Sequence, residues 1–519
     1  MKRNILPALL CLVSVSAFAQ IPEDVLKYSW QPVNNTARIN AVGGAMGSLG
    51  GDISATFVNP AGLAFYKTTD IVLSPGISFF NNKSNFRGTS AKDKSSFMNL
   101  GPTGIVGGWQ GGNKWNNSIS LAINRTASFS NKVFYTGQNN FSSQAEQYAA
   151  EAAASGTIVD NLPGDPTLSY GTRMAAWNYV IDTASIPGHP GLDIISRAMW
   201  DALKNGGAFL LNQSHTIETS GGITEIALGF ATNHNDKIYI GGSFGLPIVN
   251  YRKESTFREE DATGNNDNDF NFNEISETFT TKGVGINGRF GVIYKPAEFI
   301  RLGVAVHTPT WYSFKDTYDA TMRTDLDKFR TTPGTITVRL ADVKNPGEAD
   351  PVYKYELISP WKFMVSGSYV LREIEDVRKQ KGFITADIEY VTYKSNKFQN
   401  AEDYDDNGYY DAVNSTMKAY YKNAMNFRVG GELKFTTIMG RLGFAYYGNP
   451  YADKELKAHK MFVSGGVGYR NAGIFIDLTY VQALQKDVSF PYRLPDKANT
   501  FANVKSSGSN ISLTLGFKI

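Results

Sequence analysis

The end of the chain alternates between apolar and polar residues without exception. Every second residue from Ile511 to Ile519 is apolar, and each residue between them is polar or glycine. A strict period of two predicts a β-strand with one apolar and one polar face. The chain is therefore expected to be all-β. The same alternation recurs at 300–307, 383–391, 426–435 and 474–480.

The first residues have the pattern of a secretory leader. Lys2 and Arg3 precede an apolar stretch, and Ala17-Phe18-Ala19 is an A-x-A cleavage site. The apolar stretch is too short to anchor the chain across a bilayer. We expect residues 1–19 to be a signal peptide that is cleaved after Ala19.

The composition is compatible with strands that cross a membrane. Mean hydropathy is −0.27, a value that soluble proteins and barrels share, because lumen-facing residues dilute lipid-facing ones in a barrel. Aromatic residues make up 13% of the chain and there are 50 glycines, which fits aromatic girdles and tight turns. After the leader, no stretch approaches the ~20 apolar residues of a transmembrane helix.

Charge and cysteine content exclude several classes of function. Lys and Arg number 51 against 48 Asp and Glu, a net charge of +3, so no nucleic-acid partner is expected. The single cysteine, Cys11, lies in the leader. The mature chain is therefore expected to have neither disulfides nor a thiolate site.

Fourteen segments have strand character. Short and long connections alternate between them, as in single-chain barrels of outer membranes. An even number of antiparallel strands also brings both barrel ends to the side of the short turns. We predict a 14-stranded antiparallel transmembrane β-barrel. Its strands are expected at 69–81, 94–110, 115–130, 216–232, 237–252, 274–295, 300–318, 355–372, 382–396, 424–436, 440–449, 459–470, 473–486 and 506–519.

Residues 20–68 precede the first strand and fit none. They are rich in glycine, alanine and asparagine, and their length suits a plug, or hatch, inside the barrel. We therefore predict a hatch at 20–68 and a barrel at 69–519, with a long structured extracellular loop at 131–215. Helices are expected within the loops at Gln144–Ser155, Leu192–Lys204 and Asp411–Tyr421.

The segment before the first strand carries a family resemblance. It contains Gly43-Gly44-Ala45 and Gly50-Gly51-Asp52, and it ends in Val58-Asn59-Pro60-Ala61-Gly62-Leu63. It resembles the N-terminal hatch of the FadL/TodX family of outer-membrane transporters, whose hatch carries an Asn-Pro-Ala motif. The stretch that ends in His307-Thr308-Pro309-Thr310-Trp311 is similar to a branch of that family often labelled hemin receptors. The resemblance covers the whole layout, from leader to last strand.

The resemblance implies a function as well as a fold. It implies a hatch-plugged monomeric barrel in the outer membrane of a Gram-negative bacterium, with lipid and a hydrophobic ligand as partners. It also implies passive uptake of hydrophobic small molecules, such as long-chain fatty acids, with lateral release through the barrel wall. Asn59, Pro60, Ala61 and Gly62 match the hatch motif. Ligand contacts do not carry over, because no motif in the strands places them.

Candidate ligand-binding residues come from the chemistry of the hatch and the lumen. Phe57, Leu63 and Phe65 are the apolar hatch residues best placed to contact a lipid tail, although packing against the wall would also explain them. Arg428 is expected in the lumen, where it binds a carboxylate headgroup or fixes the hatch through ion pairs. His307 is also expected to point into the lumen.

Two breaks in the first two strands suggest a lateral gate. Pro75-Gly76 interrupts the first strand and Gly101-Pro102 interrupts the second. Proline removes a hydrogen-bond donor and glycine weakens strand pairing. If the two breaks face each other, they leave either an exit in the wall or an ordinary pair of bulges.

One loop matches part of a calcium-binding motif. Asp403, Asp405, Asn407 and Asp411 follow the spacing of an EF-hand loop. The position of the bidentate glutamate holds Asn414, so the choice is between a weak Ca²⁺ site and a solvated acidic loop. No other cofactor is expected.

Other functions fit parts of the sequence. Haem uptake needs an axial ligand, usually histidine, and His307 is the candidate in the lumen. A protein-secretion shuttle or adaptor of the same fold would hold a protein partner with its extracellular loops. An enzyme is not expected, because no G-x-S-x-G elbow is present and His307 is the only candidate base.

Overall fold

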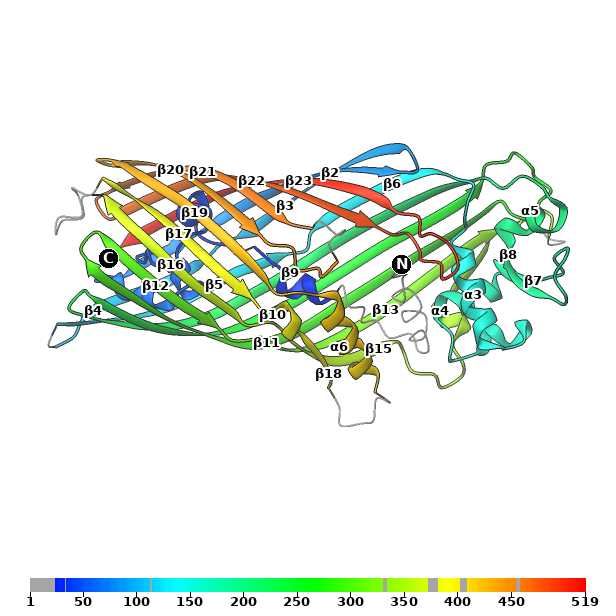
Figure 1. Ribbon diagram of the computed structural model, residues 1–519, viewed down its shortest axis with the longest axis horizontal. Coiled ribbons are helices and arrows are strands. Elements are labelled where there is room, and N and C mark those ends of the chain that lie inside the picture. The colour runs from blue at the N-terminus through cyan, green and yellow to red at the C-terminus, as the bar shows by residue number, and fades with distance from the viewer. Residues whose placement is uncertain are drawn as a thin grey trace, which may run out of the picture.

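The computed structural model describes residues 24–32, 34–112, 114–329, 334–371, 381–401, 408–453 and 458–519. The expected leader lies outside these ranges. The described chain forms a closed antiparallel barrel whose wall has 14 strands (Figure 1), which confirms the predicted fold class.

Eight wall strands are continuous and six are interrupted, so that each of the six carries two labels. The continuous strands are β9 (Leu211–His234), β10 (Ile238–Asp261), β11 (Phe272–Ala297), β19 (Ala424–Phe435), β20 (Ile438–Tyr447), β21 (Lys460–Asn471), β22 (Ile474–Ser489) and β23 (Ala502–Lys518). The interrupted strands are β1 (Asp70–Leu73) with β2 (Pro75–Phe86), β3 (Thr89–Leu100) with β4 (Thr103–Gln110), β5 (Trp115–Ser128) with β6 (Asn131–Asn139), β12 (Ile300–His307) with β13 (Trp311–Asp325), β15 (Val352–Ile358) with β16 (Lys362–Leu371), and β17 (Gly382–Val391) with β18 (Lys397–Asn400).

The barrel closes between its first and last strands. β23 pairs with β1 from Asp70↔Lys518 onward and with β2 from Gly76↔Ser512 onward, in one continuous register. The alternation seen in the last residues of the sequence thus places an apolar face toward the outside and a polar face toward the lumen.

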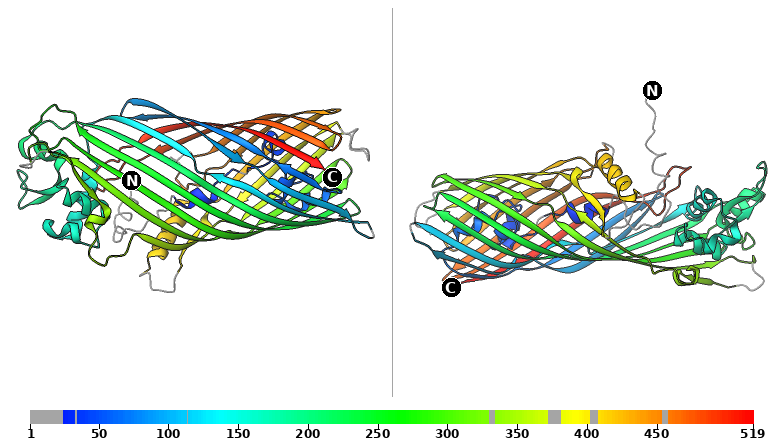
Figure 2. Two further views of the ribbon diagram at one scale, coloured as in Figure 1. Left: turned by 180° about the vertical axis from the view of Figure 1, so that it is seen from behind. Right: turned by 90° about the horizontal axis from the view of Figure 1, so that it is seen from below.

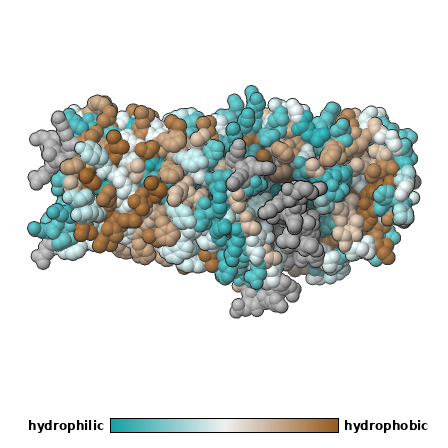
Figure 3. Space-filling model, in the orientation of Figure 1, coloured by the Kyte–Doolittle hydropathy of each residue, from teal (hydrophilic) through white to brown (hydrophobic). Residues whose placement is uncertain are grey.

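Side chains alternate between the two faces of the wall as the period of two requires. On β19, Phe427 and Val429 are 43% and 44% exposed, whereas Arg428 between them is 2% exposed. Figure 3 shows apolar residues spread over the strands in its left half and a hydrophilic zone across the middle. The outward apolar residues form the surface that a bilayer would cover.

One connection that the sequence places in a long loop is almost entirely strand. Residues 82–93 belong to β2 and β3, which are joined by a two-residue turn at Arg87 and Gly88. Both turn residues have positive φ, 46° and 88°, as a type I′ hairpin turn requires. The prediction was wrong there because polar residues on both faces hide the alternation, so nothing in that stretch distinguishes strand from loop.

The segment before β1 lies inside the barrel (Figures 1 and 2). We call residues 24–32 and 34–69 the internal segment. Backbone groups along it hydrogen-bond to side chains from strands all around the wall, among them Thr514 on β23, Asn233 on β9 and Asp387 on β17. Its helices are α1 (Asp24–Ser29), α2 (Ala37–Ala41), η2 (Ile53–Thr56) and η3 (Pro60–Phe65).

The long connection between β6 and β9 folds into a helical cap at one end of the barrel (Figure 1). It contains α3 (Ala145–Ser155), η4 (Val159–Gly164), α4 (Tyr170–Trp177), the hairpin β7 (Ile181–Ala184) and β8 (Asp193–Ser196), η5 (Arg197–Met199) and α5 (Trp200–Asn205). The cap has an apolar core shared with β10, β11 and β13, with β14 (Ile336–Arg339) and with η6 (Leu340–Val343). No helix among the described residues is long and apolar enough to cross a membrane.

The helices expected in the loops differ in outcome. Helix α3 and α6 (Tyr409–Tyr420), which follows η8 (Tyr393–Ser395) and β18, agree with the predictions to within two residues at each end. The helix expected at Leu192–Lys204 is wrong in its first half, where β8 pairs with β7. That half contains Ile194 and Ile195, and β-branched residues favour strands.

Candidate functional site

Among the described residues, part of the internal segment separates two of the chambers of the lumen. The larger chamber has a volume of about 500 Å³ and lies against β2, β3, β5 and β20 to β23. The smaller, of about 110 Å³, lies against β9, β11, β12, β16 and β17. Gln31, Pro32 and Asn34 line both chambers. This stretch of the internal segment is therefore the partition between them.

The two chambers differ in chemistry. Aromatic rings project into the larger one from several strands, including Phe80, Phe97 and Phe462. The smaller one contains the buried pair Glu225–Arg289, whose two hydrogen bonds measure 2.6 and 3.0 Å. An apolar molecule would find contacts in the larger chamber and strong desolvation costs in the smaller.

The wall beside the larger chamber has an unpaired seam. β4 is hydrogen-bonded to β1 on one side and to β5 on the other. β3, its continuation in the same wall strand, pairs with β2 only. In the described chain no ladder joins β3 to β5 or β6, although β3 runs close to β6. We call this stretch between β3 and the β5–β6 strand the open seam.

The predicted gate residues lie at the end of the open seam where β3 meets β4. Pro75 pairs with Leu100, and the N–H of Gly101 donates to the carbonyl of Ser74 at 2.7 Å. The two breaks thus face each other, as expected. The first two wall strands nevertheless stay hydrogen-bonded to each other there, with their register shifted by one residue. Pairing is lost on the far side of Gly101-Pro102, where Pro102 offers no donor to β5. Gly76 pairs with Asn99 and therefore lies within the hydrogen-bonded ladder between β2 and β3.

Asn34 of the internal segment spans the open seam. Its Nδ2 donates to the carbonyls of Leu100 (3.1 Å) and Arg125 (2.9 Å), which lie on opposite edges of the seam. Nδ2 also lies 3.4 Å from the side-chain oxygens of Asn99 and Asn124. One amide group therefore substitutes for backbone pairing at the point where the two wall strands separate. Nothing in the sequence sets this asparagine apart from its neighbours.

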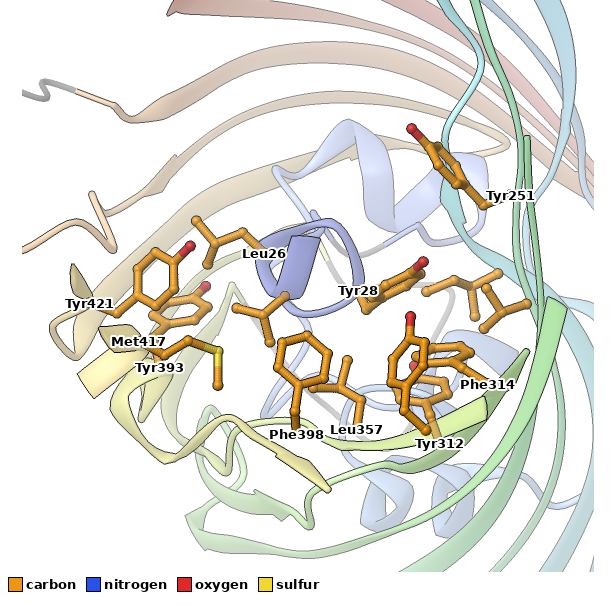
Figure 4. Packing of buried hydrophobic residues seen from close by; sticks show 14 of the residues in the cluster. Leu26, Tyr28, Tyr251, Tyr312, Phe314, Leu357, Tyr393, Phe398, Met417 and Tyr421 are labelled. Atoms are coloured by element: carbon orange, nitrogen blue, oxygen red, sulfur yellow. The ribbon is translucent and has the colours of Figure 1, made fainter. Parts of the chain in front are cut away.

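Helix α1, which precedes the partition in the chain, packs inside the lumen. Leu26 and Tyr28 are buried among wall residues and residues of α6, in a cluster that Figure 4 shows in detail. The Tyr28 ring lies 4.7 Å from that of Phe314 and 5.9 Å from that of Phe129. Met417 of helix α6 and Tyr421, which follows the helix, belong to the same cluster. The start of the internal segment and the loop that contains α6 thus share one apolar core.

The hatch motif has a clear structural role. Asn59 is the N-cap of η3: its side-chain oxygen accepts from Ala61 N at 3.1 Å, and its Nδ2 donates to the Gly47 carbonyl at 2.6 Å. Pro60 occupies the first helical position, where its fixed φ is favourable. A Cβ at Gly62 would lie 2.9 Å from Gly50 Cα. The motif therefore lets two stretches of the internal segment pack backbone against backbone.

The apolar residues proposed as ligand contacts lie away from the larger chamber. Leu63 is fully buried against β9, and Phe65 stacks on Tyr239 with ring centroids 4.1 Å apart. Phe57 borders the smaller chamber, 5.8 Å from the guanidinium of Arg289. Packing of the internal segment against the wall accounts for these three positions.

Arg428 and His307 both point into the lumen and both have protein partners. Arg428 lies 3.7 Å from Asp387 and 3.3 Å from Glu389, and it is buried. His307 donates from Nε2 to the carbonyl of Val58 at 2.7 Å. His307 thus ties the internal segment to the wall, whereas Arg428 joins neighbouring strands of the wall.

Asp387 is the centre of this attachment. Its carboxylate accepts from the backbone N–H groups of Met46 (2.9 Å) and Gly47 (3.2 Å) and from Ser366 Oγ (2.5 Å). Ser48 lies beside it, with Oγ 2.5 Å from that of Ser368. Such charge-assisted bonds are about twice as strong as neutral ones. We call β16, β17 and β19 the tied side of the lumen.

Most of the calcium candidate lies outside the described residues. That holds for Asp403, Asp405 and Asn407, whereas Asp411 lies in the first turn of α6. Among the residues that the structure describes, no group of three or more acidic, histidine or cysteine side chains is arranged to hold a metal ion. The calcium site stays a prediction.

Comparison with known proteins places the fold. Neither the models of protein families nor the curated proteins include a match to this sequence. Among solved structures, a FadL homologue from Pseudomonas aeruginosa superposes with a TM-score of 0.51 at 13% identity, covering 94% of this chain and 98% of that chain. The toluene transporter TodX of P. putida gives a TM-score of 0.50 at 12% identity, covering 94% and 99%. A deltaS2 mutant of the TodX monoaromatic hydrocarbon channel gives 0.51 at 12%, covering 93% and 98%. This chain therefore shares the fold of the FadL homologue and of TodX, which confirms the resemblance stated from the sequence at the level of the fold.

Proposed function

We propose that this protein carries hydrophobic small molecules passively across the outer membrane of a Gram-negative bacterium and releases them sideways through the open seam. One observation carries the proposal: the larger chamber is lined by both edges of that seam. Phe97 and Asn99 reach it from β3, and residues 125–131 reach it from β5 and β6. A molecule in the chamber is therefore next to the only stretch of wall, in the described chain, where neighbouring strands are not joined by a ladder.

The rest of the molecule supports this route. The outward apolar surface suits a bilayer, so that a lateral exit at the seam would open toward lipid tails. The internal segment is held by hydrogen bonds all around the wall, so passage straight through it would break many bonds at once. Displacement of Asn34 would remove the link that the internal segment makes between the two edges of the seam and would leave the bonds of Asn82 and Arg87 to β6 in place. Long-chain fatty acids and small aromatic hydrocarbons are the substrate classes to test first.

Non-enzymatic transport fits the site better than the other functions weighed. The solved structures with this fold are described as transporters and channels. None of the five histidines of the chain lines the larger chamber, so the chamber offers no imidazole for haem. The role of a protein-secretion adaptor is supported by one feature, a cap with its own apolar core. Mass spectrometry of molecules that co-purify in mild detergent separates the two: an apolar ligand supports transport, and a retained protein without ligand supports the adaptor.

The exit can be tested by blocking it. Met98 projects outward from β3 beside the seam and is 79% exposed, while Leu442 on β20 is 74% exposed and lies away from it. Because the mature chain is expected to lack cysteine, Met98→Cys and Leu442→Cys can each be labelled with a bulky maleimide. Uptake of labelled palmitate and toluene by cells that produce each variant is then measured. We expect the label at position 98 to reduce uptake several-fold and the label at position 442 to leave it unchanged. Equal uptake by both labelled variants would exclude the seam as the exit.

A further inference from the structure

The outer face of the wall carries a row of lysines. Lys505 on β23 pairs with Lys486 on β22 and with Lys83 on β2. Lys83 in turn pairs with Lys92 on β3. All four residues are exposed. Because neighbouring strands lie ~4.8 Å apart, the four side chains stand side by side across about 15 Å of wall. We call these four residues the lysine row.

The lysine row borders the apolar surface of the barrel. Lys83 lies six residues beyond Ile77 on β2, and Lys486 lies two residues beyond Leu484 on β22. Even separations keep side chains on one face of a strand, and Ile77 and Leu484 are 44% and 50% exposed on the outside. Two residues of strand cover ~7 Å, about the depth of a headgroup layer. The row therefore lies where lipid headgroups would meet the wall, toward the barrel end that carries the cap (Figure 1).

The charge of the lysine row is not neutralised by the described chain. None of the four lysines has an ion-pair partner among the described residues. Asp93 and Asp487 each follow a lysine of the row directly in sequence and therefore point to the lumen face. Across the open seam, Glu218 is already paired with Lys132. The residues two positions from the row on the outer face are uncharged or basic: Leu484, Val488, Asn503, Ser507, Asn81, Asn85, Ser90 and Lys94.

Protection of strand edges explains only part of the row. Lysine on an unpaired edge hinders association with another strand, which accounts for Lys92 beside the open seam and for Lys486, where the ladder of β22 with β21 has ended. Lys83 and Lys505 have a paired strand on each side. Like charges directly opposite each other destabilise a sheet. A bound anion would offset that repulsion at all four positions.

We propose that the lysine row binds the phosphorylated headgroup of a lipid in the outer leaflet, with the acyl chains of that lipid on the adjoining apolar surface. Charge complementarity selects the phosphate, and continuity with the apolar surface selects a lipid rather than a soluble polyanion. Because β3 forms one edge of the open seam, the bound lipid lies beside the proposed exit. The inference rests on the outer-membrane location in the proposed function and does not depend on the transport step.

Three probes identify the ligand. The full-length protein in a non-ionic detergent is titrated with lipid A (an acylated disaccharide with two phosphates), phosphatidylethanolamine (a zwitterionic lipid) and polyphosphate (a polyanion without acyl chains). We expect lipid A to bind at least about tenfold more tightly than phosphatidylethanolamine, and its affinity to fall as salt is added. Equal binding of the two lipids would overturn the inference, because the apolar surface alone would then hold them. Tighter binding of polyphosphate than of lipid A would overturn the choice of a lipid.

Variants locate the site. A variant with all four lysines of the row changed to glutamine is expected to bind lipid A at least about tenfold more weakly. Lipid A should raise the melting temperature of the parent but not that of this variant. The matched control removes the same charge from four exposed lysines in other turns and loops: Lys237→Gln, Lys394→Gln, Lys418→Gln and Lys422→Gln.

The control should bind lipid A as the parent does. Equal loss in both variants would mean that lipid A responds to overall charge, and undiminished binding by the row variant would place the lipid elsewhere; either result would contradict the inference. The titration needs no uptake. Its failure therefore leaves the proposed transport standing, and failure of the uptake experiment leaves the lysine row standing.

Discussion

The two sides of the lumen are built differently. On the tied side β16, β17 and β19 pair without interruption, and buried charges centred on Asp387 fasten the internal segment to the wall. On the side of the open seam β3 pairs with β2 alone, and single side chains span the gap in place of a ladder: Asn34 from the internal segment, and Asn82 and Arg87 from the β2–β3 hairpin. The difference shows how a barrel can hold its plug and still offer a path: the plug is fixed where the wall is continuous and lightly held where the wall is open.

The largest expected effect comes from locking the light contact. Asn34 and Asn124 approach to 3.4 Å between Nδ2 and Oδ1, so Asn34→Cys with Asn124→Cys should form a disulfide that pins the internal segment to one edge of the seam. We expect uptake to fall to background when the pair is oxidised and to return with a reductant. The measurement is uptake of labelled ligand by cells before and after reduction.

A second disulfide on the other side is the matched control. Ser48 and Ser368 face each other with their Oγ atoms 2.5 Å apart, so the pair Ser48→Cys with Ser368→Cys pins a contact that our account leaves unbroken during passage. Uptake should then change little on oxidation. If this lock stops uptake as completely as the first, the plug moves as a whole and the comparison between the two sides fails.

The next effect concerns stability. Asp387→Ala removes the acceptor of two backbone N–H groups and leaves Arg428 with less compensation, and breaking a buried ion pair costs ~3–5 kcal/mol of unfolding free energy. Asn99→Ala, on the side of the seam, removes only a long contact with Asn34 and should cost less than ~1 kcal/mol. Urea titrations followed by tryptophan fluorescence in detergent measure both. Equal losses would mean that both sides hold the plug equally.

The smallest effect lies outside both sides, in the cap. Arg173 donates to both carboxylate oxygens of Glu348, at 2.8 and 2.9 Å, and this pairing lowers the pKa of Glu348 from 4.5 to about 2. A carboxylate with a lowered pKa in the folded state stabilises that state above pH 4.5 and loses this contribution as the pH falls toward 2. We expect proteolysis of the cap to quicken over that window, and Glu348→Gln to be cleaved faster at pH 7, with the difference from the parent shrinking as the pH falls toward 2. If the cleavage rates of the parent and of Glu348→Gln change with pH in the same way, the Arg173–Glu348 pair does not cause the pH dependence.

The sequence predicted the wall far better than the site. Alternation located the strands because successive side chains of a strand point to opposite faces of the wall, one apolar and one polar. It could not show the open seam, because period says nothing about which neighbouring strands share hydrogen bonds. Gly101-Pro102 lies where the pairing with β5 ends, on the opposite edge of the strand from the predicted opening between the first two wall strands, and the gate itself stays a prediction. Arg428 and Phe65 were proposed as ligand contacts from residue type alone, and their partners, Asp387 and Tyr239, come from distant parts of the chain.

Asn34 was missed because an asparagine in a polar stretch is ordinary in sequence. Its contacts come from the path of the internal segment between two wall strands. Only the fold brings Asn34 to both edges of the open seam.

The most direct test is a crystal structure of the protein soaked with an iodinated fatty acid, in which anomalous scattering locates the iodine without assumptions about the ligand. Our account predicts iodine in the larger chamber, near Phe97 and Phe129, and at lower occupancy between β3 and β6 at the open seam. Iodine along the barrel axis beyond η3, on the far side of the internal segment, would show that ligand passes through the plug and would contradict lateral release.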